Sequence, residues 1–188
     1  MDKTAARSFF KSKRKALTKL QIEDLSLQIA NRIVKLPIWE KEFYHLFLPI
    51  EKQKEVNTEF IMHVLQGKDK HIVISKSNFV DFTMQHFLLT DTTQIEVNKF
   101  GIPEPKNGIE IKPEQLDVIF IPLLASDSKG NRVGYGKGFY DRFLHRCKPS
   151  VLKIGLSFFE PIDHKIEGFT ENDMQLNYLV TPKDTFQF

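Results

Sequence analysis

Apolar residues follow a helical spacing in one early segment of the chain and form short continuous runs elsewhere. The helical pattern is carried by Ile22, Leu25, Ile29, Ile33 and Leu36. Intervals of three and four residues place these side chains on one face of a helix, and Pro37 ends the pattern. A first continuous apolar run, residues 43–48, is ended by Pro49 and is typical of a buried strand.

The same two patterns predict the remaining elements. A helix is expected from Asn57, a favoured N-cap residue, to about Gln66, with Gly67 closing it. Another helix is expected from about Gly138 to Cys147. Further strands are predicted at residues 71–75, 84–89, 118–121, 152–158 and 178–180. Residues 90–115 contain three prolines and little periodicity, which predicts a long loop with one strand near residue 95.

Strands that alternate with helices along a chain favour an α/β fold with a largely parallel sheet. The run at 118–121 is almost wholly apolar, which suits a strand covered on both faces. A length of 188 residues fits one domain, and no internal repeat or low-complexity segment divides it. We therefore expect a single-domain, three-layer α/β/α structure over residues 1–188, Rossmann-like, with a mostly parallel sheet and helices on both faces.

Composition narrows the class of protein. Apolar residues make up 41% of the chain and charged residues 27%, which is ordinary for a globular protein. No apolar run approaches the ~18 residues of a membrane span, and no N-terminal stretch resembles a secretory signal, so no membrane partner is expected. The single cysteine, Cys147, cannot form an internal disulfide and has no C-x-x-C partner. We interpret it as a bystander in a cytoplasmic protein.

Positive charge is concentrated at the N-terminus. Residues 1–20 hold seven basic residues and one acidic residue, a net charge of +6, whereas the whole chain carries +3. Such a segment is compatible with a nucleic-acid arm, a transit peptide or an anion-binding helix. On a helix, Lys3, Arg7 and Arg14 fall within roughly 40° of each other, so they could reach one anion together. A solvated helix face is the plain alternative.

The most distinctive segment is NRVGYGKGFYDR, residues 131–142, in which three glycines stand at alternate positions. It lies between a predicted buried strand and a predicted helix, where open α/β sheets bind their ligands. Gly134, Gly136 and Gly138 would let backbone N–H groups approach an anion. Arg132 and Lys137 add positive charge. The spacing matches neither a Walker A loop nor Gly-x-Gly-x-x-Gly, yet phosphate is the ligand that this pattern favours.

A flexible linker is the alternative for this segment, but linkers have no need of large rings such as those of Tyr135, Phe139 and Tyr140. Two aspartates also bear on the site. Asp141 follows the glycines, and a carboxylate beside a phosphate needs an intervening cation such as Mg²⁺. It could instead support a helix N-terminus or pair with an arginine. Asp173 precedes the last predicted strand and, by itself, is best interpreted as a loop residue.

Residues 117–144, DVIFIPLLASDSKGNRVGYGKGFYDRFL, resemble the signature of the 5-formyltetrahydrofolate cyclo-ligase family, also called 5,10-methenyltetrahydrofolate synthetases. Weaker matches follow in the family's order along nearly the whole chain: Lys3 with Arg7, LPIEKQKEVNT at 48–58, FGIPEP at 100–105 and ENDMQLNYLVTP at 171–182. The chain departs from the family at Leu123, where glycine is frequent, and at Ser126, where phenylalanine is frequent. Both departures concern the shape of the loop after a strand more than the chemistry.

The resemblance implies the ATP-dependent conversion of 5-formyltetrahydrofolate to 5,10-methenyltetrahydrofolate, with release of ADP and phosphate. The γ-phosphoryl group is transferred to the formyl oxygen, N10 attacks the activated carbon, and phosphate leaves. Such a transfer depends on positioning and charge neutralisation more than on a protein nucleophile. The resemblance thus implies ATP as co-substrate and Mg²⁺ as the metal. We expect a monomer that binds no nucleic acid.

The resemblance also assigns roles to residues. The residues expected to bind ATP are Lys3, Arg7, Arg132, Gly134, Gly136, Lys137, Gly138 and Asp173. Those expected to contact the folate are Leu48, Glu55, Phe100, Tyr135, Phe139 and Tyr140. Catalytic roles are expected for Lys137, Arg132 and Tyr135, and metal binding for Asp141 and Asp173. Glu55 would hydrogen-bond the pterin, although a charged turn residue is its plain interpretation.

Two other classes of function stay open. A phosphosugar-binding or isomerase-like protein would also use an anion loop on an α/β sheet, but no general base near a carbonyl is evident. A non-catalytic nucleotide-binding module or an RNA-binding domain is the other. Residues 21–188 carry a net charge of −3, unlike a surface that binds RNA. Lys3 and Arg7, acting with Asp141 and Asp173, would distinguish the cyclo-ligase from both.

Overall fold

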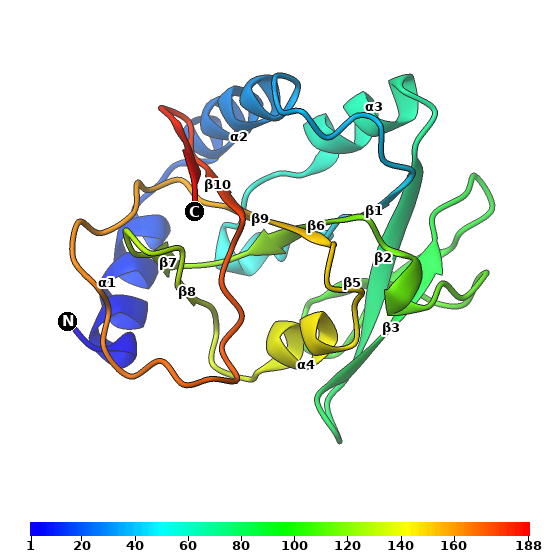
Figure 1. Cartoon of the computed structure of the whole chain (residues 1–188). Coiled ribbons are helices and arrows are strands. Elements are labelled where there is room, and N and C mark those ends of the chain that lie inside the picture. The colour runs from blue at the N-terminus through cyan, green and yellow to red at the C-terminus, as the bar shows by residue number, and fades with distance from the viewer.

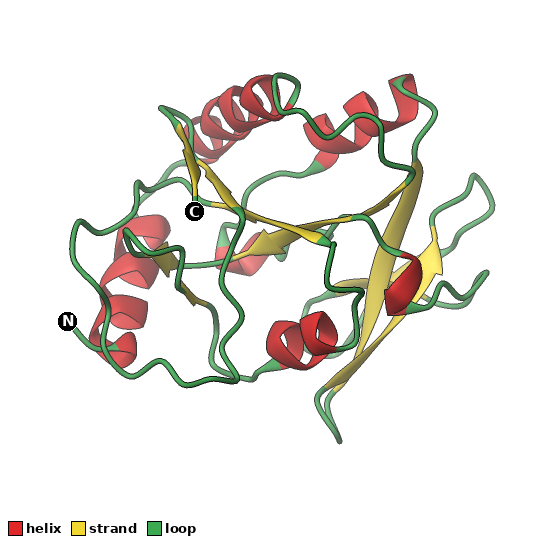
Figure 2. Ribbon diagram, in the orientation of Figure 1, coloured by secondary structure: helices red, strands yellow, loops and turns green.

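The computed structural model describes residues 1–188 and is built around a seven-stranded sheet (Figures 1 and 2). Its strands are β1 (Phe43–His45), β2 (His71–Asn78), β3 (Thr83–Leu88), β6 (Val118–Pro122), β9 (Leu152–Leu156), β10 (Tyr178–Val180) and β11 (Thr185–Gln187). They lie in the order β11-β10-β9-β6-β1-β2-β3. The five central strands pair in parallel, and only the edge strands β3 and β11 are antiparallel to their neighbours.

Helices cover both faces of this sheet. In Figure 1, α2 (Lys19–Ile33) and α3 (Glu59–Gly67) lie above the sheet, whereas α1 (Lys3–Lys15) and α4 (Phe139–His145) lie below it. A capping box starts α2: Thr18 Oγ1 accepts from the Gln21 N–H, and the Gln21 side chain accepts from the Thr18 N–H. The expected α/β/α fold with a mostly parallel sheet is confirmed.

The apolar run of β6 explains how the helices on both faces pack against the sheet. Side chains alternate across a strand, so Val118 and Phe120 join the core beneath α2 and α3, while Ile119 and Ile121 join the core beneath α4. All four are fully buried. A strand that serves two cores needs an apolar side chain at every position, which is the pattern that the sequence carries.

A small hairpin stands between β6 and α4. Its strands are β7 (Ala125–Ser126) and β8 (Arg132–Val133), and α1 packs against them. Ala6 and Phe10 of α1 belong with Val133 to a third, smaller apolar cluster. The glycine segment therefore follows β8, not the buried strand β6 directly as expected.

The start and end of α3 differ from the prediction. Its N-cap is Thr58 rather than Asn57, and Gly67 is the last helical residue rather than the closing one. The Thr58 hydroxyl donates to the carbonyl of Phe47 at 2.6 Å, which ties the helix to the chain after β1 and leaves no side-chain cap. Asn57 accepts from the Glu59 N–H at 3.1 Å, the contact of a turn residue.

The predicted loop 90–115 holds more regular structure than its prolines indicated. β4 (Ile95–Val97) pairs antiparallel with β5 (Pro103–Pro105) in a separate two-stranded ribbon. Proline is tolerated there because such a ribbon has free edges. Short 3-10 turns, η1 (Glu51–Gln53) and η2 (Pro113–Gln115), complete the elements. No helix of the structure has the length and apolarity to cross a membrane.

Candidate active site

The residues singled out in the sequence meet around one cavity of about 620 Å³. It lies where β1, β2 and β6 end and the glycine segment begins. Its lining includes all of the expected site residues: Lys3, Arg7, Leu48, Glu55, Phe100, Arg132, Gly134, Tyr135, Gly136, Lys137, Gly138, Phe139, Tyr140, Asp141 and Asp173. Segments from both ends of the chain thus contribute to one concave surface.

The glycine segment adopts a backbone that two of its glycines require. Gly136 and Gly138 have φ values of 88° and 73°, in the left-handed region that side chains disfavour. Gly134 is not in that region, and its carbonyl accepts from Arg7 Nε at 3.0 Å. A Cβ on Gly136 would stand 3.2 Å from the Arg7 guanidinium. The glycines therefore let the loop lie directly against α1.

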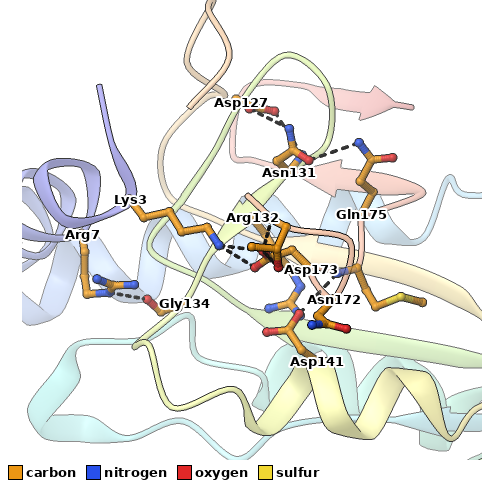
Figure 3. A network of polar contacts seen from close by, with 12 residues as sticks. Lys3, Arg7, Asp127, Asn131, Arg132, Gly134, Asp141, Asn172, Asp173 and Gln175 are labelled. Atoms are coloured by element: carbon orange, nitrogen blue, oxygen red, sulfur yellow. Dashed lines mark hydrogen bonds and ion pairs between the residues drawn. The ribbon is translucent and has the colours of Figure 1, made fainter. Parts of the chain in front are cut away.

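Lys3 of α1 reaches the loop before β10 and binds Asp173 (Figure 3). Its Nζ lies 2.7 Å from each carboxylate oxygen, and Thr170 donates from its N–H and its hydroxyl to the same carboxylate. Partial burial alone would raise the pKa of Asp173, but the bonds from Lys3 and Thr170 outweigh it and hold the pKa below its usual value. Asp173 is a charged partner of α1 and more than a loop residue.

Arg132 and Asp141 form a second ion pair close by (Figure 3). Arg132 Nη2 lies 2.6 Å from Asp141 Oδ1, and Arg132 is only 8% exposed. Burial lowers the pKa of Arg132, while the charge of Asp141 opposes that change. Arg132 Nε is buried and has no partner, so one donor of this guanidinium stays available.

The two aspartates belong to the same part of the cavity. The N–H of Met174, the residue after Asp173, donates to Asp141 Oδ1 at 3.3 Å. Asp141 Oδ2 takes no hydrogen bond. The structure contains no group of three or more His, Cys, Asp and Glu side chains that could hold a metal ion. Any metal at this site would therefore need ligands from a substrate as well.

Glu55 lies deep in the wall of the same cavity. It is 4% exposed, accepts from the Tyr135 hydroxyl at 2.6 Å, and accepts from the Ile50 N–H at 2.7 Å. Burial raises the pKa of Glu55, and the bonds from Ile50 and Tyr135 and the charge of Arg14 oppose this rise. Burial, followed by the charge of Glu55, raises the pKa of Tyr135, so the phenol is a neutral donor. Glu55 is therefore a buried, hydrogen-bonded carboxylate, and more than a charged turn residue.

Aromatic rings line another part of the cavity. Phe79, which is one of them, and its neighbour Phe82, which packs behind them, were missed in the sequence. Phe79 lies 4.2 Å from Phe100 and 5.2 Å from Phe139, measured between ring centroids, and Phe82 lies 5.7 Å from Phe139. Phe79 and Phe82 occupy the turn between β2 and β3. An aromatic pair within a polar turn was the available signal. Lys137 is exposed at this side, with Nζ 6.0 Å from the Phe82 ring.

A polar group on the sheet was also missed. His45 Nε2 and His86 Nδ1 contact the same Ser75 hydroxyl, at 2.6 Å and 2.8 Å. Burial, with the neighbouring His86, lowers the pKa of His45 well below its usual value. Burial, with the charge of Arg146, lowers the pKa of His86 to about 3. Both imidazoles are therefore neutral near pH 7, and His45 and Ser75 line the cavity.

Cys147 is away from the cavity. It is half-buried behind α4, and burial raises the pKa of its thiol to about 12. A thiol with so high a pKa is a poor nucleophile.

Comparison with known proteins gives this geometry its context. The model of the 5-formyltetrahydrofolate cyclo-ligase family matches residues 1–182. The 5-formyltetrahydrofolate cyclo-ligase of Haemophilus influenzae is 31% identical over 149 residues, which cover 76% of this chain and 78% of that protein. The NMR structure of Aquifex aeolicus 5,10-methenyltetrahydrofolate synthetase superimposes with a TM-score of 0.84 at 28% identity, covering 100% of this chain and 93% of the other.

A structure of 5,10-methenyltetrahydrofolate synthetase from Mycoplasma pneumoniae is also similar. It gives a TM-score of 0.76 at 25% identity and covers 97% of this chain and 99% of the other. Both solved structures match nearly the full length of the present chain, as does the family model. The chain therefore belongs to the 5-formyltetrahydrofolate cyclo-ligase family.

Proposed function

We propose that this protein converts 5-formyltetrahydrofolate and ATP into 5,10-methenyltetrahydrofolate, ADP and phosphate. Membership of the family implies a folate substrate with ATP as co-substrate. The observation that supports the proposal most directly is that one cavity is lined by basic residues, a glycine loop, Glu55 and aromatic rings. A phosphorylated nucleotide and a flat, polar ring system need both kinds of lining in one place.

The chemistry requires that the formyl oxygen be made a leaving group. In the proposed reaction the oxygen attacks the γ-phosphorus, the bond to ADP breaks, and an iminophosphate forms. N10 then attacks the former formyl carbon, loses its proton, and phosphate departs. Each step creates or moves negative charge on phosphoryl oxygens, so correctly placed cations and N–H donors lower the barrier.

The basic residues and the glycine loop of the cavity, together called the phosphate wall, are assigned to ATP. Lys3 and Arg7 come from one face of α1. The glycine loop supplies backbone N–H groups and the side chain of Lys137. Arg132 retains a buried, unpartnered Nε beside Asp141. Phosphate oxygens would satisfy that donor and would compete with the aspartates for Lys3 and Arg132.

Asp141 and Asp173 fit Mg²⁺ as carboxylate ligands. Mg²⁺ commonly takes one or two carboxylates and completes its shell with phosphate oxygens and water. Asp141 Oδ2 is free of hydrogen bonds, and Asp173 is held close by through the Met174 N–H contact. When bound, the metal would supply positive charge that neutralises the phosphoryl oxygens. The chain's own part is to hold both aspartates in place, Asp141 through Arg132 and Asp173 through Lys3.

Glu55 and the aromatic rings of the cavity, together called the folate wall, are assigned to the folate. Phe100 and Phe139 present rings that could flank the pterin, and Leu48 adds apolar surface. Glu55 is positioned to accept N–H groups of the pterin, with Tyr135 and Tyr140 beside it. Tyr135 is itself a residue of the glycine loop, so its bond to Glu55 joins the two parts of the cavity.

The test is an absorbance assay for the methenyl product with purified protein. Product should form from 5-formyltetrahydrofolate only when ATP and Mg²⁺ are both present. In a Mg²⁺ titration, Asp141→Ala should need more metal for half-maximal rate than the wild type. A folded protein that forms no methenyl product with both present would refute the proposed function.

A further inference from the structure

Arg14 is a buried cation that no direct ion pair accounts for. It lies in the last turn of α1 and is 5% exposed. Its Nη1 donates to the carbonyl of Leu123 at 3.4 Å, its Nη2 donates to the Tyr135 hydroxyl, and its Nε has no partner. None of the protein's four ion pairs includes it. A buried charge without a counter-charge is costly, so the structure around Arg14 must supply one.

The counter-charge lies one hydrogen bond further on. Arg14 donates to the oxygen of Tyr135, and the same hydroxyl donates its own proton to Glu55 Oε1 at 2.6 Å. The direction of both bonds is fixed, because a guanidinium can only donate and a carboxylate can only accept. The guanidinium also lies over the tyrosine ring, 5.5 Å from its centroid. Arg14, Tyr135 and Glu55 thus form one relay from cation to carboxylate.

The same helix holds the neighbouring residues of the glycine loop. Arg7 Nε donates to the carbonyl of Gly134, and Arg14 binds the side chain of the next residue, Tyr135. Lys3 at the other end of α1 binds Asp173. The phosphate wall and the folate wall are therefore both supported by α1.

From this geometry, and on the basis of the proposed function, we propose that Arg14 is a positioning residue. It orients Tyr135 and keeps Glu55 a carboxylate that can accept hydrogen bonds from the folate. Arg14 itself touches neither substrate. It ties the folate wall to the helix that carries the phosphate-binding cations.

The charge of Arg14 has a definite effect on Glu55. Burial raises the pKa of Glu55, and the bonds from Ile50 and Tyr135 and the Arg14 charge lower it. The titratable or charged groups that face Glu55 are Arg14 from α1, Tyr135 from the glycine loop and Tyr140 from α4. The two phenols are neutral, so Arg14 supplies the only positive charge among them. Its removal must raise the pKa of Glu55 further.

The first measurement does not depend on catalysis. The carboxyl carbon of Glu55 is titrated by NMR in the wild type, in Arg14→Met and in Arg14→Lys. Glu55 should titrate at higher pH in Arg14→Met, and Arg14→Lys should lie between, because lysine keeps the charge but not the forked geometry. If Arg14→Met does not fold, Arg14→Gln, which keeps an N–H donor and lacks the charge, carries the same test.

The second measurement uses the enzyme assay. In Arg14→Met, the KM for 5-formyltetrahydrofolate should rise about tenfold, the scale of one hydrogen bond to a charged group, and the KM for ATP should change less. The acid limb of kcat/KM for the folate should move to higher pH with the Glu55 titration. Arg14→Lys should restore part of both effects.

Arg32→Met is the matched control. Like Arg14, Arg32 lies in the last turn of a helix, here α2, and donates to backbone carbonyls, those of Pro182 and Lys183. Unlike the relay of Arg14, it lies outside the cavity. It should lower stability without altering the pH profile. A Glu55 titration unchanged in Arg14→Met, with only a loss of stability like that of Arg32→Met, would overturn the inference. A third outcome separates the two proposals. If the Glu55 titration shifts in Arg14→Met but the wild type forms no methenyl product, the proposed function is refuted and the role of Arg14 stands.

Discussion

Lys137 stands between two glycines of left-handed conformation, on a loop that bends tightly beside α1. Its side chain is exposed and lies near Phe82 rather than in an ion pair. It can therefore turn inward without breaking an existing bond. A lysine is a flexible point charge, able to follow a phosphoryl group as it moves from ADP to the formyl oxygen.

Lys137→Ala should accordingly lower kcat, with a smaller change in the affinity for ATP. That combination marks an interaction strongest in the transition state. Steady-state kinetics with ATP varied at saturating folate provide the measurement. A variant with near-normal kcat would show that Lys137 only faces solvent, and that the glycine backbone and Arg132 stabilise the transferred group.

Arg7 supports the loop through Gly134 and faces the cavity beside Gly136. Arg7→Ala should raise the KM for ATP about tenfold, because a charge-assisted contact to phosphate is lost, and should raise the KM for the folate less. Lys15→Ala, on the exposed side of the same helix, is the control and should leave both values unchanged. Equal effects of Arg7→Ala on the two substrates would contradict the assignment of Arg7 to ATP.

Helical spacing predicted that Lys3, Arg7 and Arg14 share one face of a helix, and they do. It did not predict their separate tasks. Spacing sets the direction of a side chain, whereas Arg14 lies about 10 Å further along the axis than Arg7 at 1.5 Å per residue. That distance takes Arg14 past the phosphate wall to Tyr135. The depth of Glu55 was equally hidden, because a charged turn sequence carries no signal of burial.

At the scale of elements, β9 depends on one small residue. A Cβ on Gly155 would stand 2.6 Å from a methyl carbon of Leu123 and 2.6 Å from one of Leu176, both buried. The side chains of Leu123 and Leu176 therefore fill the space beside Gly155.

Gly155→Ala should therefore destabilise the protein by about 1–3 kcal/mol, the usual range for overpacking a core. Thermal or urea unfolding gives the measurement. Gly67→Ala, at the end of α3 with no atom within 4 Å of the added Cβ, should leave stability unchanged or raise it slightly. Equal stability of Gly155→Ala and the wild type would mean that the two leucines move aside at no cost.

Elements with a strong pattern were predictable, and contacts set by register were not. The apolar runs of β6 and β10 and the helical spacing of α2 located those elements. β5 was missed, because its prolines indicate a loop unless a free edge is known to be present. The contact of His45, Ser75 and His86 requires the pairing of β1 with β2 and of β2 with β3, and a shift of one residue would turn the side chains to opposite faces.

At the scale of the whole molecule, we propose that residues 1–188 unfold as one domain, since three apolar clusters share one sheet and its hairpin. The buried histidines then affect its global stability. The pKa of His86 is about 3 in the folded protein, against 6.5 ordinarily. Below about pH 6.5 the unfolded chain binds a proton that the folded protein does not, so the free energy of unfolding falls as the pH drops toward 3.

His86→Gln removes this titration while keeping a polar partner for Ser75, and should flatten the loss of stability between pH 6.5 and pH 3. Chemical denaturation across that pH range is the measurement. His63→Gln, at an exposed position of α3, is the control. A pH dependence in His86→Gln as steep as in the wild type would show that other groups, His45 or the carboxylates, cause the acid sensitivity.

The ion pair between Lys3 and Asp173 joins positions 170 residues apart in the chain. A ribosome synthesises a chain from the N-terminus to the C-terminus, so α1 emerges while the loop that carries Asp173 has yet to be translated. The β7–β8 hairpin and the glycine loop, which α1 also contacts, are still missing when α1 emerges. Helix α1 therefore cannot complete its contacts until the loop that carries Asp173 has been translated, and the cavity cannot close before then.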